Sequence, residues 1–315
     1  MMNNILVSVL IPTYNVEDFI YDAIVSIQNQ SYNNFEIVVV DDGSSDRTVQ
    51  ILETIQITES RLRLFKNEVN SGIVKTLNFG ISQCNGEYIM RMDGDDLCHH
   101  QKMEKQLNFL VNNKNIHLIG CDIYSIDIND NVLNKIETSH NLSSTNKILK
   151  YTCPILHIWM CKKELYTILG GYRELGGSED YDFLLRMKSN GYNFTNLPYY
   201  GYSVRIREGN TQSSNGLMQR KIVYYIRRLY RERLSTKSNI DSFNENDKLK
   251  YLTSNIFHRE LHNTSVKFTN KAMIYRMQKK YILFFIFASV SIISPYQLLF
   301  FIESYYSKYL LKKFN

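Results

Sequence analysis

The feature that most constrains the fold is a regular alternation of short apolar runs with segments of helical periodicity through the first third of the chain. The apolar runs are residues 6–11, 35–40, 62–65 and 88–92, and the helical segments are residues 18–30, 48–55, 73–84 and 102–112. Strands that alternate with helices form a mainly parallel sheet with right-handed crossovers. The sequence therefore predicts an α/β fold, with helices flanking a mixed, mainly parallel sheet.

Polar residues follow three of these expected strands. They occupy residues 12–15, 41–46 and 93–96. In an open α/β sheet, ligands bind beyond the carboxyl ends of the strands. We therefore expect the three polar segments to meet in one cleft.

The third polar segment is the most acidic. Asp93, Asp95 and Asp96 place three carboxylates within four residues, and such clustered charge is unfavourable unless a cation offsets it. Oxygen ligands suit Mg²⁺ or Mn²⁺, ions that also bind nucleotide phosphates. An acidic surface turn is the alternative, because Asp and Gly are common turn residues. The expected meeting of three strand ends favours the metal site.

A second acidic group, Glu179 and Asp180, stands at the expected start of another helix. A purely structural interpretation is available there. Ser178 would cap the helix, and acidic side chains in a first turn are favoured by the helix dipole. Local sequence alone leaves both interpretations open.

Charge divides the chain into two parts. Residues 1–215 hold 19 Lys and Arg against 25 Asp and Glu, net −6, and residues 216–315 hold 18 against 6, net +12. A basic segment suits nucleic acid or an anionic membrane. The segment contains no nucleic-acid motif but does contain an apolar stretch, so we expect the membrane to be its partner.

That apolar stretch, residues 281–302, has 22 residues without a charge and lysines on both sides. Its length would span a bilayer, but Pro295 and several serines argue against a straight span. Three arrangements remain open: interfacial or re-entrant attachment, packing within the protein or a homodimer, and a true span. Five scattered cysteines without a Cys-x-x-Cys pair, and no basic flank at the N-terminus, predict a reducing location without a signal peptide. We expect the cytoplasmic face of the inner membrane.

Four segments together resemble the family 2 glycosyltransferases of GT-A fold, particularly bacterial enzymes of capsule, lipopolysaccharide or other surface-glycan synthesis. They are residues 7–15, which read VSVLIPTYN, residues 36–46, which end in DDGSSD, residues 86–96, and residues 179–182, which read EDYD. Their order and spacing also match, so the resemblance covers about the first 215 residues.

The resemblance implies a site for a nucleotide sugar, with UDP as the expected nucleotide. Pro12, Thr13 and Tyr14 would line the base pocket. Asp42 would accept a hydrogen bond from the uracil ring, with Asp41 as its neighbour in the same pocket.

The acidic cluster takes its roles from the same resemblance. Asp95 would be the direct metal ligand, and Asp93 would lie nearer the ribose or a metal-bound water. Arg91 and Lys75 are candidates for phosphate contact, although each also fits a surface or salt-bridge residue. Arg207 stands where many relatives have a histidine. Because a guanidinium cannot bind a cation, we expect it to pair with the diphosphate.

Asp180 matches the family's general base, with Glu179 as the alternative, and Asp182 and Arg186 look structural. The implied reaction is metal-dependent transfer of one hexose, with inversion, to a glycan or lipid-linked acceptor. A non-catalytic nucleotide-sugar-binding scaffold and a sugar nucleotidyltransferase are the alternatives. We expect a nucleotide-sugar-binding half at residues 1–120, an acceptor-binding half at 121–215 and a basic helical region at 216–315.

Overall fold

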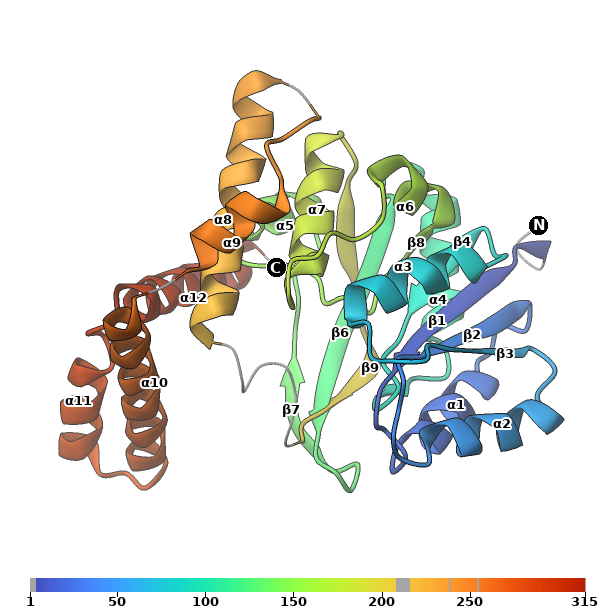
Figure 1. The fold of residues 1–315 in the computed structure, drawn as a ribbon, viewed down its shortest axis with the longest axis horizontal. Helices are drawn as coiled ribbons and strands as arrows, with labels where there is room; N and C mark the ends of the chain where they lie inside the picture. The colour runs from blue at the N-terminus through green and yellow to red at the C-terminus, as the bar shows by residue number, and fades with distance from the viewer. Residues whose placement is uncertain (1–3, 208–215, 238, 254, 315) are drawn as a thin grey trace.

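The protein forms one mixed sheet flanked by helices, followed by a C-terminal group of helices (Figure 1). The computed structural model describes residues 4–207, 216–237, 239–253 and 255–314. Its strands are β1 (Val7–Thr13), β2 (Phe35–Asp41), β3 (Leu62–Lys66), β4 (Tyr88–Arg91), β5 (Leu97–Cys98), β6 (Leu118–Ile126), β7 (Val132–Ile136), β8 (Met160–Lys162) and β9 (Phe194–Arg205). Its helices are α1 (Ile20–Gln28), α2 (Thr48–Thr58), α3 (Ile73–Gln83), α4 (Lys102–Asn112), α5 (Leu142–Ile148), α6 (Lys163–Leu169), α7 (Glu179–Ser189), α8 (Gly216–Thr236), α9 (Glu245–Leu252), α10 (Ile256–Met277), α11 (Tyr281–Val290) and α12 (Pro295–Phe314).

The strand order is β3-β2-β1-β4-β8-β6-β9-β5, with β7 paired to β6. The first four strands are parallel, as the alternation predicted. The three-residue strand β8 runs antiparallel to both β4 and β6, and β6 is parallel to β9. The predicted α/β class with a mixed, mainly parallel sheet is therefore confirmed.

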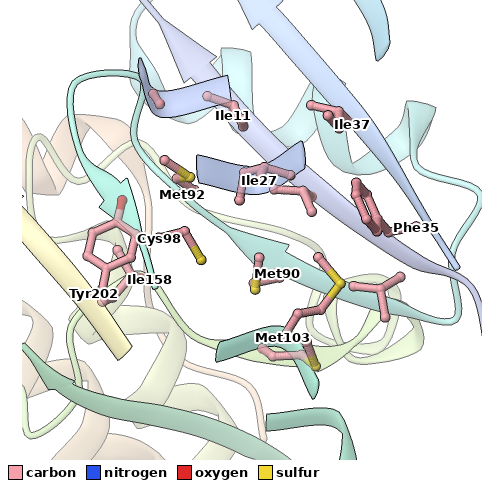
Figure 2. Close-up of a cluster of buried hydrophobic side chains, with 14 of the residues drawn as sticks. Ile11, Ile27, Phe35, Ile37, Met90, Met92, Cys98, Met103, Ile158 and Tyr202 are labelled. Carbon is pink, nitrogen blue, oxygen red and sulfur yellow. The ribbon is translucent and has the colours of Figure 1, made fainter. Parts of the chain in front are cut away.

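Alternating side chains of the buried strands fill two cores. Val7, Val9 and Ile11 of β1 face α1, α2 and α4, whereas Leu10 faces α3 on the other side. This is the period of two that a strand imposes. Figure 2 shows Ile11 in the first core with Ile27 and other buried side chains. Both faces of the central strands are thus buried, and their chemistry is confined to their ends.

Two predicted boundaries are wrong. Strand β1 does not stop before Pro12 but continues to Thr13. Pro12 is tolerated because β1 pairs there only with β2; its pairing with β4 ends at Leu10. The sequence also predicts a single helix over residues 249–262, but the structure has two there, because α9 ends at Leu252 and α10 begins at Ile256.

The apolar stretch 281–302 lies in a bent pair of helices. No single helix in the described ranges is long and apolar enough to cross a membrane, but α11 and α12 meet that test together. A bend of 119° separates them. Figure 1 shows α10 and α11 projecting away from the sheet, whereas α12 leads back to α5.

Candidate active site at the strand ends

The three polar strand ends do converge. The Thr13 hydroxyl lies 3.1 Å from Asp41 Oδ1, and the backbone N–H of Asp42 donates to the Thr13 carbonyl at 2.9 Å. A Cβ at Gly94 would lie 2.8 Å from Thr13 Cγ2, so residues 93–96, which we call the acidic turn, touch the end of β1. The three polar segments therefore lie together at one edge of the sheet, with Thr13 in contact with both of the others.

The two aspartates after β2 are held by the surrounding loops. Asp41 accepts hydrogen bonds from the backbone and hydroxyl of Ser44. Asp42 Oδ1 accepts from Asn67 and from the backbone of Ser71, and Oδ2 accepts from the backbone of Gly72, each at 2.8 Å. A carboxylate oxygen accepts more than one hydrogen bond. Oδ2 thus keeps an acceptor position for an N–H group of a bound base.

Gly43 permits this turn. Its φ is +77°, and a Cβ there would lie 2.9 Å from the backbone N of Asn70. Only glycine adopts this conformation without strain and also leaves room for the neighbouring loop. The sequence Asp-Asp-Gly is therefore a geometric requirement of the loop that surrounds Asp42.

Asp93 is held between two cationic side chains. His157 Nε2 lies 2.7 Å from Asp93 Oδ2, and Arg91 Nη2 lies 3.6 Å from Oδ1. Burial alone would raise the pKa of Asp93, but the charges of His157 and Arg91 lower it below its usual range. In the same contact, burial acts to lower the pKa of His157, and the Asp93 carboxylate raises it above the ordinary value. Asp93 is consequently ionised and fixed in orientation.

Asp95 and Asp96 are tied to the end of β9. Arg207 Nε lies 2.7 Å from Asp95 Oδ2. The backbone N–H of Arg205 donates to Asp96 Oδ1 at 2.8 Å, and its side chain donates to the Asp95 carbonyl. Burial and the charges of Asp93 and Asp95 raise the pKa of Asp96 well above its usual value. The end of β9 therefore closes one side of the acidic turn.

Arg91 joins the acidic turn to the start of α7. It is 4% exposed, and its Nη1 lies 3.5 Å from Glu179 Oε1. The adjacent Asp180 is half-buried, and its Oδ1 accepts from the backbone of Tyr181. Burial and the Glu179 carboxylate raise the pKa of Asp180 to about 6, against opposing effects of His157 and Arg91. A carboxylate with that pKa is well suited to take up a proton near neutral pH.

The two interpretations of the α7 terminus can now be compared. Ser178 is the N-cap residue, but its side chain makes no capping hydrogen bond. Glu179 is 5% exposed, and its Oε2 is buried without a hydrogen-bond partner among the described residues. Helix-dipole stabilisation does not require a buried carboxylate with an oxygen that lacks a hydrogen bond. The contact of Glu179 with Arg91, which also contacts Asp93, favours the functional interpretation.

The rest of α7 has the structural role expected for it. Arg186 Nε lies 2.7 Å from Asp182 Oδ2, and both side chains are buried. The other guanidinium nitrogens of Arg186 donate to the carbonyls of Leu169 and Gly171. This network fixes the helix that carries Asp180 against the preceding loop.

Of the remaining predicted residues, Tyr14 and Lys75 are exposed and Pro12 is buried. Tyr14 is 47% exposed just beyond Thr13. Lys75 is exposed in the first turn of α3, three residues after Gly72, and forms no ion pair within the described ranges. Pro12 is a buried part of β1 rather than of the loop. Tyr14 and Lys75 are thus accessible to a ligand, whereas Pro12 packs within the sheet.

The carboxylates of the acidic turn offer an incomplete metal site. No group of three or more His, Cys, Asp or Glu side chains in the described part of the chain is arranged to hold a metal. Asp93 Oδ1, however, is buried without a hydrogen-bond partner there, and Asp95 uses Oδ2 for Arg207. Carboxylate oxygens are the ligands that Mg²⁺ and Mn²⁺ prefer. These residues fit a cation whose remaining ligands come from a diphosphate and water.

His157 and Arg205 were not singled out by the sequence. His157 is a lone histidine 64 residues from its partner Asp93, and Arg205 lies 109 residues from Asp96. Only the pairing of β8 with β4, and the return of β9 along β6 and β5, bring them to the site. Spacing along the chain contains no signal for either contact.

Solved structures of low sequence identity share this fold. Staphylococcus aureus TarS 1-349, solved in complex with UDP-GlcNAc, aligns with a TM-score of 0.60 and 24% identity over 78% of this chain and 70% of that one. The mannosyltransferase PcManGT from Pyrobaculum calidifontis, in complex with GDP-Man and Mn²⁺, aligns with a TM-score of 0.58 and 16% identity over 96% of this chain and 87% of its own.

Curated relatives match the same region. The Bacillus subtilis protein named glycosyltransferase EpsE is 31% identical over 70% of this chain and 78% of its own length. Escherichia coli WfgD, named a UDP-Glc:alpha-D-GlcNAc-diphosphoundecaprenol beta-1,3-glucosyltransferase, is 32% identical over 47% of this chain. The chain spans 57% of the length of WfgD and 56% of a Haemophilus influenzae glycosyltransferase that is 35% identical.

The sequence profile described as glycosyl transferase family 2 matches residues 8–166, half of the chain. That range begins in β1, contains the Asp-Asp-Gly loop and the acidic turn, and ends in α6. The matched range, the relatives and the shared fold agree, and the chain belongs to glycosyl transferase family 2.

Proposed function

We propose that the protein transfers one hexose from a UDP-sugar to a hydroxyl group of a glycan or lipid-linked acceptor, with inversion at the anomeric carbon. The observation that carries this proposal is Asp180, whose pKa is raised to about 6, beside Glu179, which contacts the same Arg91 side chain as Asp93. In a single displacement, the base and the leaving group must stand on opposite sides of the reacting carbon.

The proposed reaction balances without an external reactant. Asp180 takes the proton of the acceptor hydroxyl as its oxygen bonds to the anomeric carbon. The bond from that carbon to the diphosphate oxygen breaks, and its electron pair leaves with UDP. Arg207, which contacts Asp95, and the exposed Lys75 would pair with the diphosphate, and Arg91 keeps Glu179 and Asp93 in place.

Mn²⁺ or Mg²⁺ is the proposed cofactor, held by Asp95 and by Asp93 Oδ1. When bound, such an ion would neutralise charge on the diphosphate. The Mn²⁺ in the PcManGT complex and the carboxylate oxygens of the turn support this choice. Because each aspartate already has a cationic partner, we expect weak binding of the metal in the absence of the nucleotide.

The direct test is a donor screen. The full chain with Mn²⁺ and a set of UDP-sugars should release UDP from one donor, and a lipid-linked or oligosaccharide acceptor should increase that release. The anomeric configuration of the product, measured by NMR, should be opposite to that of the donor. If no donor yields UDP with any acceptor, the non-catalytic scaffold would be the better description. Exchange of pyrophosphate into a nucleotide sugar would identify a nucleotidyltransferase instead.

A lipid-linked acceptor in bacterial surface-polysaccharide synthesis is the more specific part of the proposal. It is supported by the name of WfgD, which describes a diphosphoundecaprenol-linked acceptor, and by the basic, apolar C-terminal helices. Such an acceptor would place the protein at the cytoplasmic face of the inner membrane. Kinetics with the same saccharide, with and without its lipid, test whether the acceptor is lipid-linked. Equal kcat/KM for the two acceptors would show that the enzyme does not recognise the lipid.

His157 is expected to matter for the donor through Asp93. Replacing His157 by leucine removes a hydrogen bond to an ionised carboxylate, a loss of about 1.5–3 kcal/mol or roughly 10- to 100-fold in kcat/KM. His157→Gln, which keeps an N–H at similar reach, should recover most of it. Steady-state kinetics with the donor varied, together with the melting temperature of each variant, checks the prediction. Equal activity of the leucine variant and the wild type would contradict it.

A further inference from the structure

The C-terminal helices bury several polar side chains and expose many apolar ones. His262 Nδ1 lies 2.9 Å from the Ser294 hydroxyl, and both residues are buried. Gln297, also buried, donates to Thr269. The exposed apolar side chains of α11, α12 and the turn between them form what we call the apolar surface. Its members include Ile282, Phe285, Ile286, Ile292, Leu299 and Ile302.

This polarity is the reverse of that of a helix packed in a water-soluble core. Ile282 is 79% exposed and Phe285 67%, and none of the side chains described in α11 is buried. Exposed apolar patches of this kind mark surfaces that contact a partner or a membrane. Residues 256–314 also hold 9 Lys and Arg against 2 Asp and Glu, net +7. An apolar surface on a strongly basic segment is complementary to an anionic lipid bilayer.

A groove of about 500 Å³ opens beside the apolar surface, between α8, α9, α10 and α12. Arg228, Arg231 and His258 line it together with aromatic side chains, among them Tyr251. Leu299 lines the groove and is itself 43% exposed. The groove and the apolar surface are therefore continuous.

The two arginines of this groove have no acidic partner among the described residues. Within α8, Arg227 pairs with Glu303 and Arg233 with Asp241, whereas Arg228 and Arg231 take part in no ion pair there. The Arg228 guanidinium lies over the ring of Tyr251, at 5.6 Å from its centroid.

Acidic groups do border these arginines on another side. Glu232 and Asp247 line a neighbouring cavity that Arg228 and Arg231 also border. Glu232 accepts a hydrogen bond from Ser242, and Asp247 accepts one from Asn244. Neither carboxylate lines the groove beside Leu299. The lining of that groove therefore carries arginines and no carboxylate, and the acidic side chains lie only in the neighbouring cavity.

We propose that the groove binds the phosphate of an anionic lipid headgroup when the apolar surface of α11 and α12 rests in the membrane interface. Two guanidinium groups provide forked hydrogen-bond donors that match phosphate oxygens. The tyrosines occupy the headgroup level that such amphipathic rings prefer. The proposal goes beyond the transfer reaction, since it concerns where and how the protein is held at the membrane.

Sedimentation of the full chain with vesicles tests the proposal. Binding should be weak to phosphatidylcholine vesicles and strong once phosphatidylglycerol is added. The variant R228Q/R231Q should lose at least about 10-fold of its affinity for the anionic vesicles. R228K/R231K keeps the charge but loses the forked donors, and should lose part of the affinity.

The matched control is K267Q/K271Q, which removes the same charge from exposed positions of α10 outside the groove. If it weakens binding as much as R228Q/R231Q, and R228K/R231K binds like the wild type, general surface charge explains the binding and the groove proposal is wrong. Inorganic phosphate alone is the second control. If it stabilises the protein as strongly as anionic vesicles do, the groove binds free phosphate and the lipid-headgroup proposal is wrong.

Two further measurements complete the test. I282D/F285D should abolish binding to both kinds of vesicle. A dimer in light scattering that this variant dissociates would instead assign the apolar surface to a second copy of the chain. All variants should retain UDP release from the donor in solution, so a failure of the membrane proposal is distinguishable from a failure of the proposed transfer reaction.

Discussion

Replacing Asp180 by asparagine is expected to reduce sugar transfer by about 10³-fold, the contribution of a well-placed general base. The shape of Asn is nearly that of Asp, so donor binding should change little. The wild-type kcat/KM should rise about tenfold per pH unit below pH 6 and level off above it, because burial and Glu179 raise the pKa of Asp180 to about 6. The variant should have lost this dependence in its residual activity.

The same substitution should stabilise the fold. The ordinary pKa of an aspartate is about 4, so below that pH both the folded and unfolded states are protonated and the substitution has no electrostatic effect. Between about pH 4 and 6 the unfolded state ionises first, and stability falls as pH rises. Above pH 6 Asp180 is ionised in both states, and the folded state carries the full free-energy cost of its half-buried charge. Asn removes it, and because Asp180 is only half-buried we expect a gain on the order of 1 kcal/mol at pH 8.

Activity and urea unfolding of the same preparations check both expectations. Glu174→Gln is the matched control, since it neutralises an exposed carboxylate six residues earlier and should change neither quantity. Full activity of Asp180→Asn would show that the general base is Glu179 or a residue outside α7. A loss of stability at pH 8 would show that the Asp180 carboxylate is stabilised in the folded protein.

Replacing Arg186 by methionine is expected to lower the free energy of unfolding by about 3–5 kcal/mol, since it leaves the buried Asp182 without its charged partner. The change also removes donors from the carbonyls of Leu169 and Gly171. Arg173 Nη1, at 3.9 Å from Asp182, offsets only part of the negative charge that the variant leaves unpaired. Activity should fall together with stability, because α7 carries the proposed base.

The double variant Asp182→Asn/Arg186→Met separates charge from packing. Removing both charges should recover a large part of the lost stability, because the penalty arises from one uncompensated buried ion. Urea unfolding at pH 7 measures the four corners of this double-mutant cycle. If the single variant costs less than about 1 kcal/mol, the ion pair of Arg186 with Asp182 does not hold the helix.

The sequence was most informative where the physical signal is local. The helix predicted over 102–112 agrees with α4, because apolar residues at helical spacing need no distant partner to be recognised. The strand ends that carry Thr13, Asp41 and Asp93 were placed at one edge by the alternation rule alone. What remained hidden were the pairs that join distant segments, above all His157 with Asp93 and Arg91 with Glu179.

In the C-terminal region, the sequence did not reveal which residues pack between the helices. Serines within residues 281–302 looked like a weakness of an apolar segment. In the structure Ser291 and Ser294 are buried against α10, where Ser294 bonds His262, and the neighbouring Ile292 and Ile293 are exposed. The bend falls just before Pro295, the first residue of α12, and contacts with α10 bury the serines there. A hydropathy pattern contains no information on that partner.

The antiparallel strand β8 limits how this protein can be altered. Met160 pairs at once with Met90 of β4 and Ile119 of β6. A one-residue insertion just before β8 would shift the register or displace His157, so its contact with Asp93 would be lost. The exposed hairpin that contains β7 has no such double pairing. Natural variation in length, and engineered tags or grafted loops, should therefore be found at that hairpin rather than between α5 and β8.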